Sequence, residues 1–136
     1  MILADTSAWV EYDRATGSAV DQRVTELIST EGPLAVSEPV IMEVVSGART
    51  DGREADLRRL HRRFDLLRFD PASDFDAAAR VYRTCRGAGV TPRGMVDCMI
   101  VSVARRHSAS LLAQDSDISL VADVVGVEMD GASRLA

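Results

Sequence analysis

The sequence lacks lysine and asparagine, and it contains only two histidines and two cysteines among its 136 residues. All 16 basic residues are therefore arginine. A P-loop needs a lysine on the nucleotide phosphates, and Schiff-base enzymes need an amine nucleophile, so both classes are excluded. The two cysteines, Cys85 and Cys98, are too few for a disulfide framework. We therefore expect a cytoplasmic protein with reduced thiols.

Long apolar runs and targeting signals are also missing. No stretch approaches the ~20 apolar residues that a membrane-spanning helix needs. The first five residues carry no basic segment and reach a carboxylate at Asp5, so we expect no signal peptide. Apolar residues make up 46% of the chain and charged residues 27%, as in ordinary folded proteins. The length predicts a single domain over residues 1–136.

Short apolar runs alternate with segments of helical periodicity along the chain. We expect strands at 2–4, 34–36, 66–69, 111–113 and 124–128. Between them, helices are expected to begin near Ser7 (as a cap), Ala19, Ser37, Glu54, Ser73, Pro92 and Ser116. This alternation predicts an α/β fold, a three-layer α/β/α domain with a central, mainly parallel sheet. Ligand sites in such folds lie at the carboxyl ends of the strands.

Acidic residues follow two of the expected strands. Asp5 comes directly after the first strand, and Asp115 follows residues 111–113 after one residue, with Asp117 two further on. Because the carboxyl ends of parallel strands share one edge of the sheet, Asp5 and Asp115 are expected to converge there. A helix N-cap alone would also explain Asp115. A carboxylate that adjoins a buried strand, as Asp5 does, needs a partner.

Two further acids lie on expected helices. Asp97 is in the first turn of an apolar helix, where the helix dipole favours a negative charge. Glu43 points off the apolar stripe of its helix, as a solvated glutamate would. If both meet Asp5 and Asp115, the like charges need a cation, and ligands that are all oxygen favour Mg²⁺ or Mn²⁺. Such a site suits metal-assisted phosphodiester cleavage.

Four segments, taken in order, resemble the PIN-domain ribonucleases and most closely the VapC-type toxins of bacterial toxin–antitoxin pairs. They are Asp5-Thr6-Ser7, residues 41–48 around Glu43, residues 96–104 around Asp97, and Asp115-Ser116-Asp117. The resemblance covers essentially the whole chain. This sequence departs from the common family pattern at Ala113, Gln114 and Ile118, beside the last pair of acids.

The resemblance implies a PIN-like fold and a set of site residues. Asp5, Glu43, Asp97 and Asp115 would form the catalytic acidic quartet that binds Mg²⁺ or Mn²⁺. Asp117 would be an additional metal-binding acid, and the hydroxyl of Thr6 or Ser7 would support the attacking water.

The resemblance also implies an activity and its control. The chain would be a Mg²⁺-dependent endoribonuclease toxin that cleaves structured RNA, either tRNA or rRNA, by a metal-activated water. It would form a homodimer and be restrained by a cognate VapB-type antitoxin, with no membrane partner. Exposed apolar residues such as Trp9 and Val10 are expected to pack against the antitoxin, and an antitoxin arginine is expected to pair with the carboxylates.

Arginines are concentrated between positions 49 and 68, where seven occur, although the net charge is −5. On the helix expected at 54–64, four of them lie opposite the apolar stripe: Arg58, Arg59, Arg62 and Arg63. These four are candidates for contacting RNA phosphates. A solvated helix face, or a surface for an acidic protein, explains the same pattern.

Other functions remain open at this point. A non-catalytic PIN-like scaffold that binds RNA or protein would carry the same segments. A ribonuclease that uses the RNA 2′-hydroxyl would need His61 and His107 as an acid–base pair. His61 is more simply explained as a packed helix residue, and His107 as a residue that favours its helix end. Phosphotransferases and receiver domains with strand-end acids need a lysine that is absent.

Overall fold

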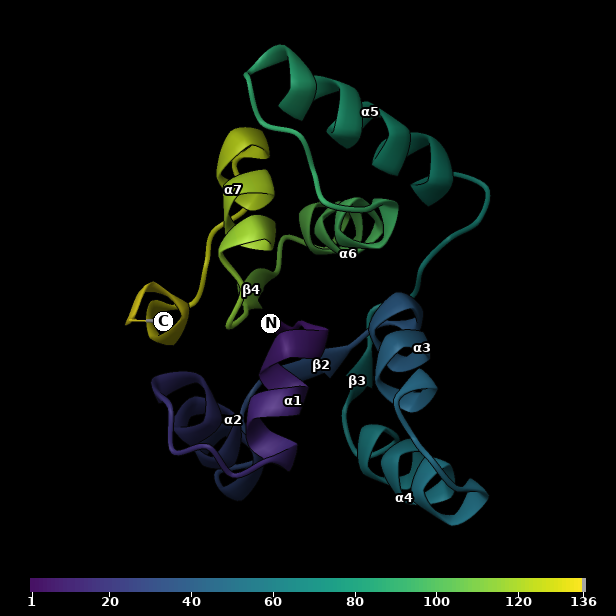
Figure 1. The fold of residues 1–136 in the computed structure, drawn as a ribbon, viewed down its shortest axis with the longest axis vertical. Coiled ribbons are helices and arrows are strands. Elements are labelled where there is room, and N and C mark those ends of the chain that lie inside the picture. The colour runs from purple at the N-terminus through teal and green to yellow at the C-terminus, as the bar shows by residue number, and fades with distance from the viewer. Residues whose placement is uncertain (136) are drawn as a thin grey trace.

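The computed structural model describes residues 1–135 (Figure 1). Seven α-helices, four strands and a 3-10 helix are described in that range. In chain order they are β1 (Ile2–Ala4), α1 (Thr6–Asp13), α2 (Ala19–Ser29), β2 (Leu34–Val36), α3 (Glu38–Ser46), α4 (Asp51–His61), β3 (Asp65–Leu66), α5 (Asp74–Gly87), α6 (Met95–Arg106), β4 (Ser110–Leu112), α7 (Ser116–Val125) and η1 (Gly131–Leu135).

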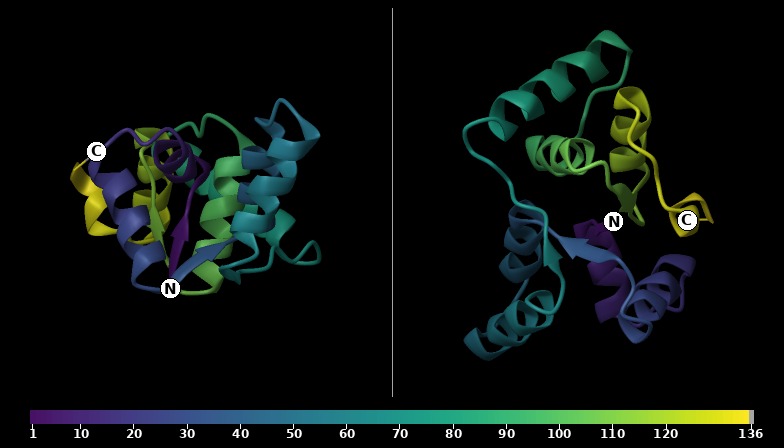
Figure 2. Two further views of the ribbon diagram at one scale, coloured as in Figure 1. Left: turned by 90° about the horizontal axis from the view of Figure 1, so that it is seen from below. Right: turned by 180° about the vertical axis from the view of Figure 1, so that it is seen from behind.

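The four strands form one parallel sheet in the order β3-β2-β1-β4. Helices cover both of its faces, as predicted. In Figures 1 and 2, α5, α6 and α7 gather on one side of the sheet, while α2 and α4 lie towards the other. The chain builds outward from β1 through β2 to β3 and then returns to β4 on the opposite side of β1. The strand order therefore reverses at β1, the point where open α/β sheets form a crevice at their carboxyl edge.

Strands β1, β2 and β4 are buried on both faces, which explains why they read as short, continuous apolar runs, whereas the edge strand β3 is exposed. Leu3, Leu111 and Leu112 are fully buried, and Ile100 of α6 and Val20 of α2 are buried in the same core. Packing on both faces fixes β1 and β4 side by side in the register Leu3↔Leu111. The residues that follow these two strands are held equally firmly.

Two expected strands differ from the structure. The segment 66–69 contributes only Leu66 to β3, which pairs as Ala35↔Asp65; Leu67 adds one further hydrogen bond to Val36. The segment 124–128 is not a strand, because α7 continues to Val125 and ends at Gly126 in the left-handed conformation. A single parallel bridge, Leu111↔Met129, follows it.

No helix within residues 1–135 is both long enough and apolar enough to cross a membrane.

Candidate active site

Asp5 begins the site at the carboxyl end of β1, where it is also the N-cap of α1. Its Oδ2 accepts hydrogen bonds from the Ser7 hydroxyl at 2.7 Å and from the Ser7 backbone N–H at 3.3 Å. The expectation that Ser7 is the cap is therefore wrong. Instead, the Ser7 hydroxyl accepts a hydrogen bond from the Gln114 backbone N–H at 2.9 Å. Ser7 thus links the end of β1 to the end of β4.

The other carboxylate oxygen of Asp5, Oδ1, is buried and has no hydrogen-bond partner. Asp5 as a whole is only 3% exposed. Burial raises the pKa of this carboxyl group, although hydrogen bonds from Ser7 and Thr6 oppose the rise, and the charge of Glu43 adds to it. A buried carboxylate oxygen without a partner is costly, which indicates that a cation or donor belongs beside it.

Asp97 reaches the same place from the first turn of α6, with 7% of the residue exposed. Its pKa is raised to about 6, first by burial and then by the charge of Asp5. Arg93 opposes the rise, while Asp115 and Glu43 add to it. Asp97 therefore lies within electrostatic range of carboxylates from three other segments: the end of β1, helix α3 and the residue that follows β4.

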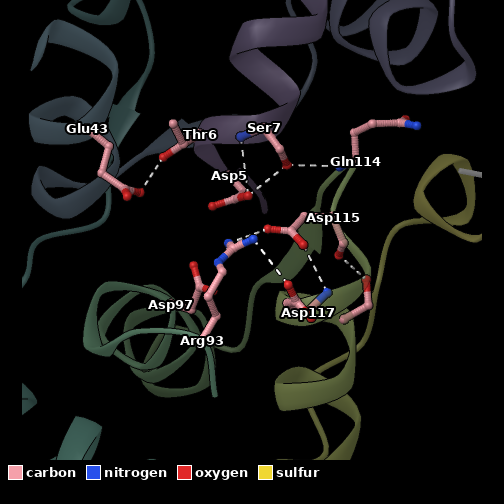
Figure 3. Close-up of polar contacts among 10 residues, drawn as sticks. Asp5, Thr6, Ser7, Glu43, Arg93, Asp97, Gln114, Asp115 and Asp117 are labelled. Atoms are coloured by element: carbon pink, nitrogen blue, oxygen red, sulfur yellow. Dashed lines mark hydrogen bonds and ion pairs between the residues drawn. The ribbon is translucent and has the colours of Figure 1, made fainter. Parts of the chain in front are cut away.

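Asp115 and Asp117 follow β4 and open α7. The Asp115 Oδ1 accepts a hydrogen bond from the Asp117 backbone N–H at 2.9 Å, so Asp115 is indeed the N-cap of α7. Its Oδ2 is turned towards the other acids instead and meets Arg93 (Figure 3). Capping and site-facing roles therefore coexist in one side chain, as they do in Asp5.

Glu43 stands at the side of the cluster, on α3, and is half-buried. The Thr6 hydroxyl donates a hydrogen bond of 2.6 Å to its Oε1. Figure 3 shows this pair reaching from α3 to α1, beside Asp5. The poor helical phase of Glu43 follows from this position, because the residue faces a neighbouring helix end rather than the core.

Arg93 is the residue that sequence reasoning missed. Its Nη2 donates to Asp115 Oδ2 at 2.6 Å and to Asp97 Oδ2 at 3.2 Å, and its Nη1 donates to Asp117 Oδ2 at 3.1 Å (Figure 3). These interactions raise the pKa of Arg93. The spacing of four residues to Asp97 was the available signal, since an Arg and an Asp so placed near a helix start can meet.

The carboxylates provide the type of donor atom that a hard divalent cation prefers. The donors are all oxygen, and one buried oxygen of Asp5 has no partner. Within residues 1–135, no three acidic, histidine or cysteine side chains are spaced to hold an ion as they stand. Arg93 lies among three of the acids, so ion binding on that side requires its guanidinium to shift.

The expected basic helix is α4, and much of its charge is paired. Arg58 pairs with Glu54 and Arg59 with Asp56, each at 2.8 Å. Within residues 1–135, no ion pair is found for Arg62 or Arg63. Arg63 lines a pocket with Leu34, the first residue of β2, and so lies at the amino edge of the sheet. The acidic cluster lies at the opposite, carboxyl edge.

The histidines occupy separate surroundings. His61 is buried with both ring nitrogens unpartnered, and its ring lies 4.9 Å from that of Trp9, centroid to centroid. His107 caps the end of α6, with Nε2 at 3.4 Å from the Arg68 carbonyl oxygen. They do not form the acid–base pair of the alternative mechanism. Trp9 is only 2% exposed, so the expectation that it is a surface residue is wrong.

Comparison with known proteins agrees with this arrangement. The model of the PIN domain family matches residues 2–124. The chain is 44% identical to ribonuclease VapC11 of Mycobacterium tuberculosis over 129 residues, which is 94% of this chain and 96% of that protein.

Solved structures share the fold. The chain resembles VapBC2 from Rickettsia felis bound to a DNA fragment from their promoter, with a TM-score of 0.73 and 18% identity over 96% of this chain and 98% of that one. It also resembles VapC20 of Mycobacterium tuberculosis, a sarcin–ricin-loop-cleaving toxin, with a TM-score of 0.63 and 18% identity over 88% of this chain and 93% of that one.

Proposed function

This chain belongs to the PIN-domain family, among its VapC ribonucleases, and from that premise we propose that it is a Mg²⁺- or Mn²⁺-dependent endoribonuclease toxin acting on structured RNA. The observation that carries the metal and the site is the set of mutually acting carboxylates with the unpartnered Asp5 Oδ1 among them. We assign the catalytic and metal-binding roles to Asp5, Glu43, Asp97 and Asp115, with Asp117 as an additional ligand.

Each of these residues has a separate task in cleavage. A divalent ion, when bound, supplies the positive charge that activates a water and stabilises the phosphate during in-line displacement. Asp5 and Asp97 offer it buried oxygens, held by the end of β1 and the start of α6. Ser7 fixes the rotamer of Asp5 through Oδ2 and leaves Oδ1 free for the site.

Glu43 and Thr6, at the edge of the site, are proposed to orient the attacking water and to accept its proton. Glu43, fixed by the Thr6 hydroxyl, is half-buried and so remains accessible to water. We assign to this pair the orientation of the attacking water and the acceptance of its proton. The products are expected to carry 5′-phosphate and 3′-hydroxyl ends, because water, and not an RNA 2′-hydroxyl, attacks the phosphorus, and the 3′-oxygen leaves and takes up a proton.

The substrate is proposed to be a folded RNA such as tRNA or rRNA. The similar VapC20 is a toxin that cleaves the sarcin–ricin loop, which supports the rRNA alternative without excluding tRNA. The net charge of −5 leaves few cationic surfaces for phosphate binding. The arginines of α4 and the turn that follows it, namely Arg58, Arg59, Arg62 and Arg63, are proposed to contact the RNA backbone away from the cleaved bond.

Control is proposed to come from a VapB-type antitoxin, with the toxin itself a homodimer. The fold is shared with VapBC2, in which toxin and antitoxin occur together. Between α1, α3 and α4 lies a pocket of about 190 Å³, lined by Trp9, Val10 and Glu43 among others. We propose that an antitoxin segment occupies this pocket, whose lining combines apolar residues such as Val10 with charged ones such as Asp13 and Arg53, and that an arginine from the segment reaches the acids nearby.

The direct test is the chemistry of the cut RNA ends. Purified protein should cleave a tRNA or rRNA substrate with Mg²⁺ or Mn²⁺, stop in EDTA, and leave 5′-phosphates that ligate to an adaptor without kinase treatment. Ends with 2′,3′-cyclic phosphate that persist in EDTA would refute the metal mechanism. Tight RNA binding without cleavage, under any divalent ion, would favour the non-catalytic scaffold.

A further inference from the structure

Arg93 divides the acidic cluster into two halves. On the outer half, its guanidinium bridges Asp115 and Asp117, whose side chains are 15% and 50% exposed. On the inner half are Asp5, which Arg93 does not contact, and the buried Asp97, which it touches at 3.2 Å. Figure 3 shows the guanidinium between Asp97 and the two acids of the β4–α7 junction.

The guanidinium stands in a place that a second metal ion would need. Two-metal nuclease sites hold their ions about 4 Å apart, and carboxylates bridge them. A second ion on the outer half would use Asp115 and Asp117, but these oxygens already accept charge-assisted hydrogen bonds of 2.6 Å and 3.1 Å from Arg93. An arginine stays charged at all working pH values, so its positive charge is permanent there.

The backbone holds Arg93 in that place. Pro92 before it is buried, and Gly94 after it is the N-cap of α6 in extended conformation. Arg93 is four residues from Asp97, so the same helix start positions both side chains. The Arg93 side chain is 59% exposed, and its guanidinium is held in the site by its contacts with Asp97, Asp115 and Asp117.

The inner half has the opposite property. Asp5 Oδ1 is buried and unpartnered, and among the side chains described for residues 1–133 no arginine or histidine pairs with the Asp5 carboxylate. The two halves thus differ in how much positive charge is already supplied: Arg93 pairs with both outer acids, whereas on the inner half it reaches only Asp97, at 3.2 Å. A divalent ion gains most beside the unpaired oxygen, which is Asp5 Oδ1.

We propose that Arg93 is the resident cation of the Asp115–Asp117 half, so that this site holds one divalent ion, on its Asp5–Asp97 half. Arg93 is a positioning residue here: it holds Asp115 and Asp117 and supplies the charge that a second ion supplies elsewhere. The inference deepens the proposed nuclease function and rests on it for the identity of the site.

The test is the number of Mn²⁺ ions bound, measured by electron paramagnetic resonance of free Mn²⁺ during titration of the full chain. The wild type is expected to bind one equivalent. Arg93→Gln is expected to bind two, with the first about tenfold tighter because a neighbouring positive charge is gone. Arg93→Lys, which keeps the charge, should again bind one. Arg105→Gln, an exposed arginine at the far end of α6, is the matched control and should behave as wild type.

A second measurement guards against a misfolded variant. In EDTA, Arg93→Gln should unfold at a lower temperature than Arg105→Gln, because three acids lose their cation, and saturating Mn²⁺ should remove the difference. Two equivalents in the wild type, or one equivalent of unchanged affinity in Arg93→Gln, would overturn the inference. The number of Mn²⁺ ions that the wild type binds tests the inference even if Arg93→Gln does not fold.

Failure of the nuclease proposal would look different. One bound Mn²⁺ in a wild type that cuts no RNA would refute the proposed activity and leave the role of Arg93 standing. Two bound ions in an active wild type would refute the role of Arg93 and leave the activity standing. No bound ion at all would overturn both.

Discussion

Asp5 and Asp97 are kept in surroundings that oppose their charge. Burial raises the pKa of both carboxyl groups, and each lies close enough to other acids to feel their repulsion. A protein selected only for stability would place apolar or hydrogen-bonded groups there. The repulsion is explained if the cluster serves to bind a cation, since the ion offsets it when it binds.

Asp5→Asn and Asp97→Asn should each abolish RNA cleavage while the fold survives. Asparagine has nearly the same shape but lacks the charge that holds the ion. Metal-free stability should be equal or higher in both variants, because like-charge repulsion is relieved. RNA cleavage assays and urea unfolding in EDTA measure the two effects.

The matched control is Asp76→Asn, an exposed acid on α5, which should leave cleavage unchanged. Asp117→Asn should be milder than the two central variants, because half of its side chain is exposed. Wild-type cleavage by either central variant would mean that the site is wrongly assigned.

The contribution of Asp97 to the stability of the metal-free protein should fall as the pH rises from about 4 to about 6. Asp97 has a pKa of about 6 in the folded chain against an ordinary value of 3.8, so between these values the folded state holds a proton that the unfolded state has released. The contribution of Asp97 to the free energy of unfolding therefore falls across that window, by up to about 3 kcal/mol at about 1.36 kcal/mol per pKa unit.

Comparison with Asp97→Asn isolates this contribution. Asp74 has the opposite pH dependence, because the interactions with Arg106 outweigh burial and lower the pKa of its carboxyl group. Its contribution to stability is therefore lost at low pH. That loss is the same in the wild type and in Asp97→Asn, so it cancels in the comparison. Urea midpoints in EDTA at pH 4.5 and 7 should converge at the lower pH and diverge at the higher, with the variant more stable. Parallel curves would contradict the expectation.

Among the residues of the site, the sequence predicted the acids but not Arg93, the arginine that lies between them. The strand-end rule needs only the positions of Asp5 and Asp115. Asp97 and Glu43 depend on how α6 and α3 pack, so they were found through the family resemblance. Arg93 escaped both routes, because no periodicity marks a residue in a short loop and the densest group of arginines lies at 49–68.

Helix α4 is the element whose role is least determined by its own sequence. Its arginines read as one basic face, but acids within the helix neutralise Arg58 and Arg59, and only Arg62 and Arg63 of the four remain without an ion pair in the described residues. Surface pairs of this kind contribute about 0–1 kcal/mol to stability. Their main effect is on the charge that the helix presents to a phosphate.

Arg62→Gln with Arg63→Gln should weaken RNA binding more than Arg58→Gln with Arg59→Gln. The first pair carries unpaired charge, while the second leaves Glu54 and Asp56 behind and changes the net charge equally, which makes it the matched control. The slope of log affinity against log salt should fall by about one for each phosphate that the variant no longer binds. Binding of a tRNA-sized substrate at salt concentrations from about 50 to about 200 mM measures it, and an unchanged slope in both variants would favour a solvated face.

Element boundaries failed where the apolar pattern fits two structures. Val124-Val125 reads as part of a strand, yet it completes the last turn of α7, because short apolar runs do not distinguish a buried helix from a strand. Gly126, with a φ of 79°, then ends the helix. In the same way Leu67 and Phe69 are buried like strand residues although β3 ends at Leu66.

The whole molecule places its chemistry where its topology reverses. β1 is central and is flanked by β2 and β4, so the residues that follow β1 and β4 lie side by side at the carboxyl edge where the strand order reverses. Asp5 and Asp115 are the acids at that place. The alternating pattern of short strands and helices was enough to predict this arrangement, whereas the strand order itself needed the structure.

An endoribonuclease of this family should harm the cell that makes it unless another molecule restrains it. Expression of this chain alone in a bacterium should arrest growth and create discrete new RNA 5′-phosphate ends, which sequencing of 5′ ends detects. Co-expression of the neighbouring gene should relieve both effects, because a bound antitoxin competes for the acids or covers the pocket between α1, α3 and α4. Asp97→Asn, expressed to the same level, should cause neither effect. Normal growth with no new ends, despite abundant folded wild-type protein, would favour a scaffold that binds without cutting.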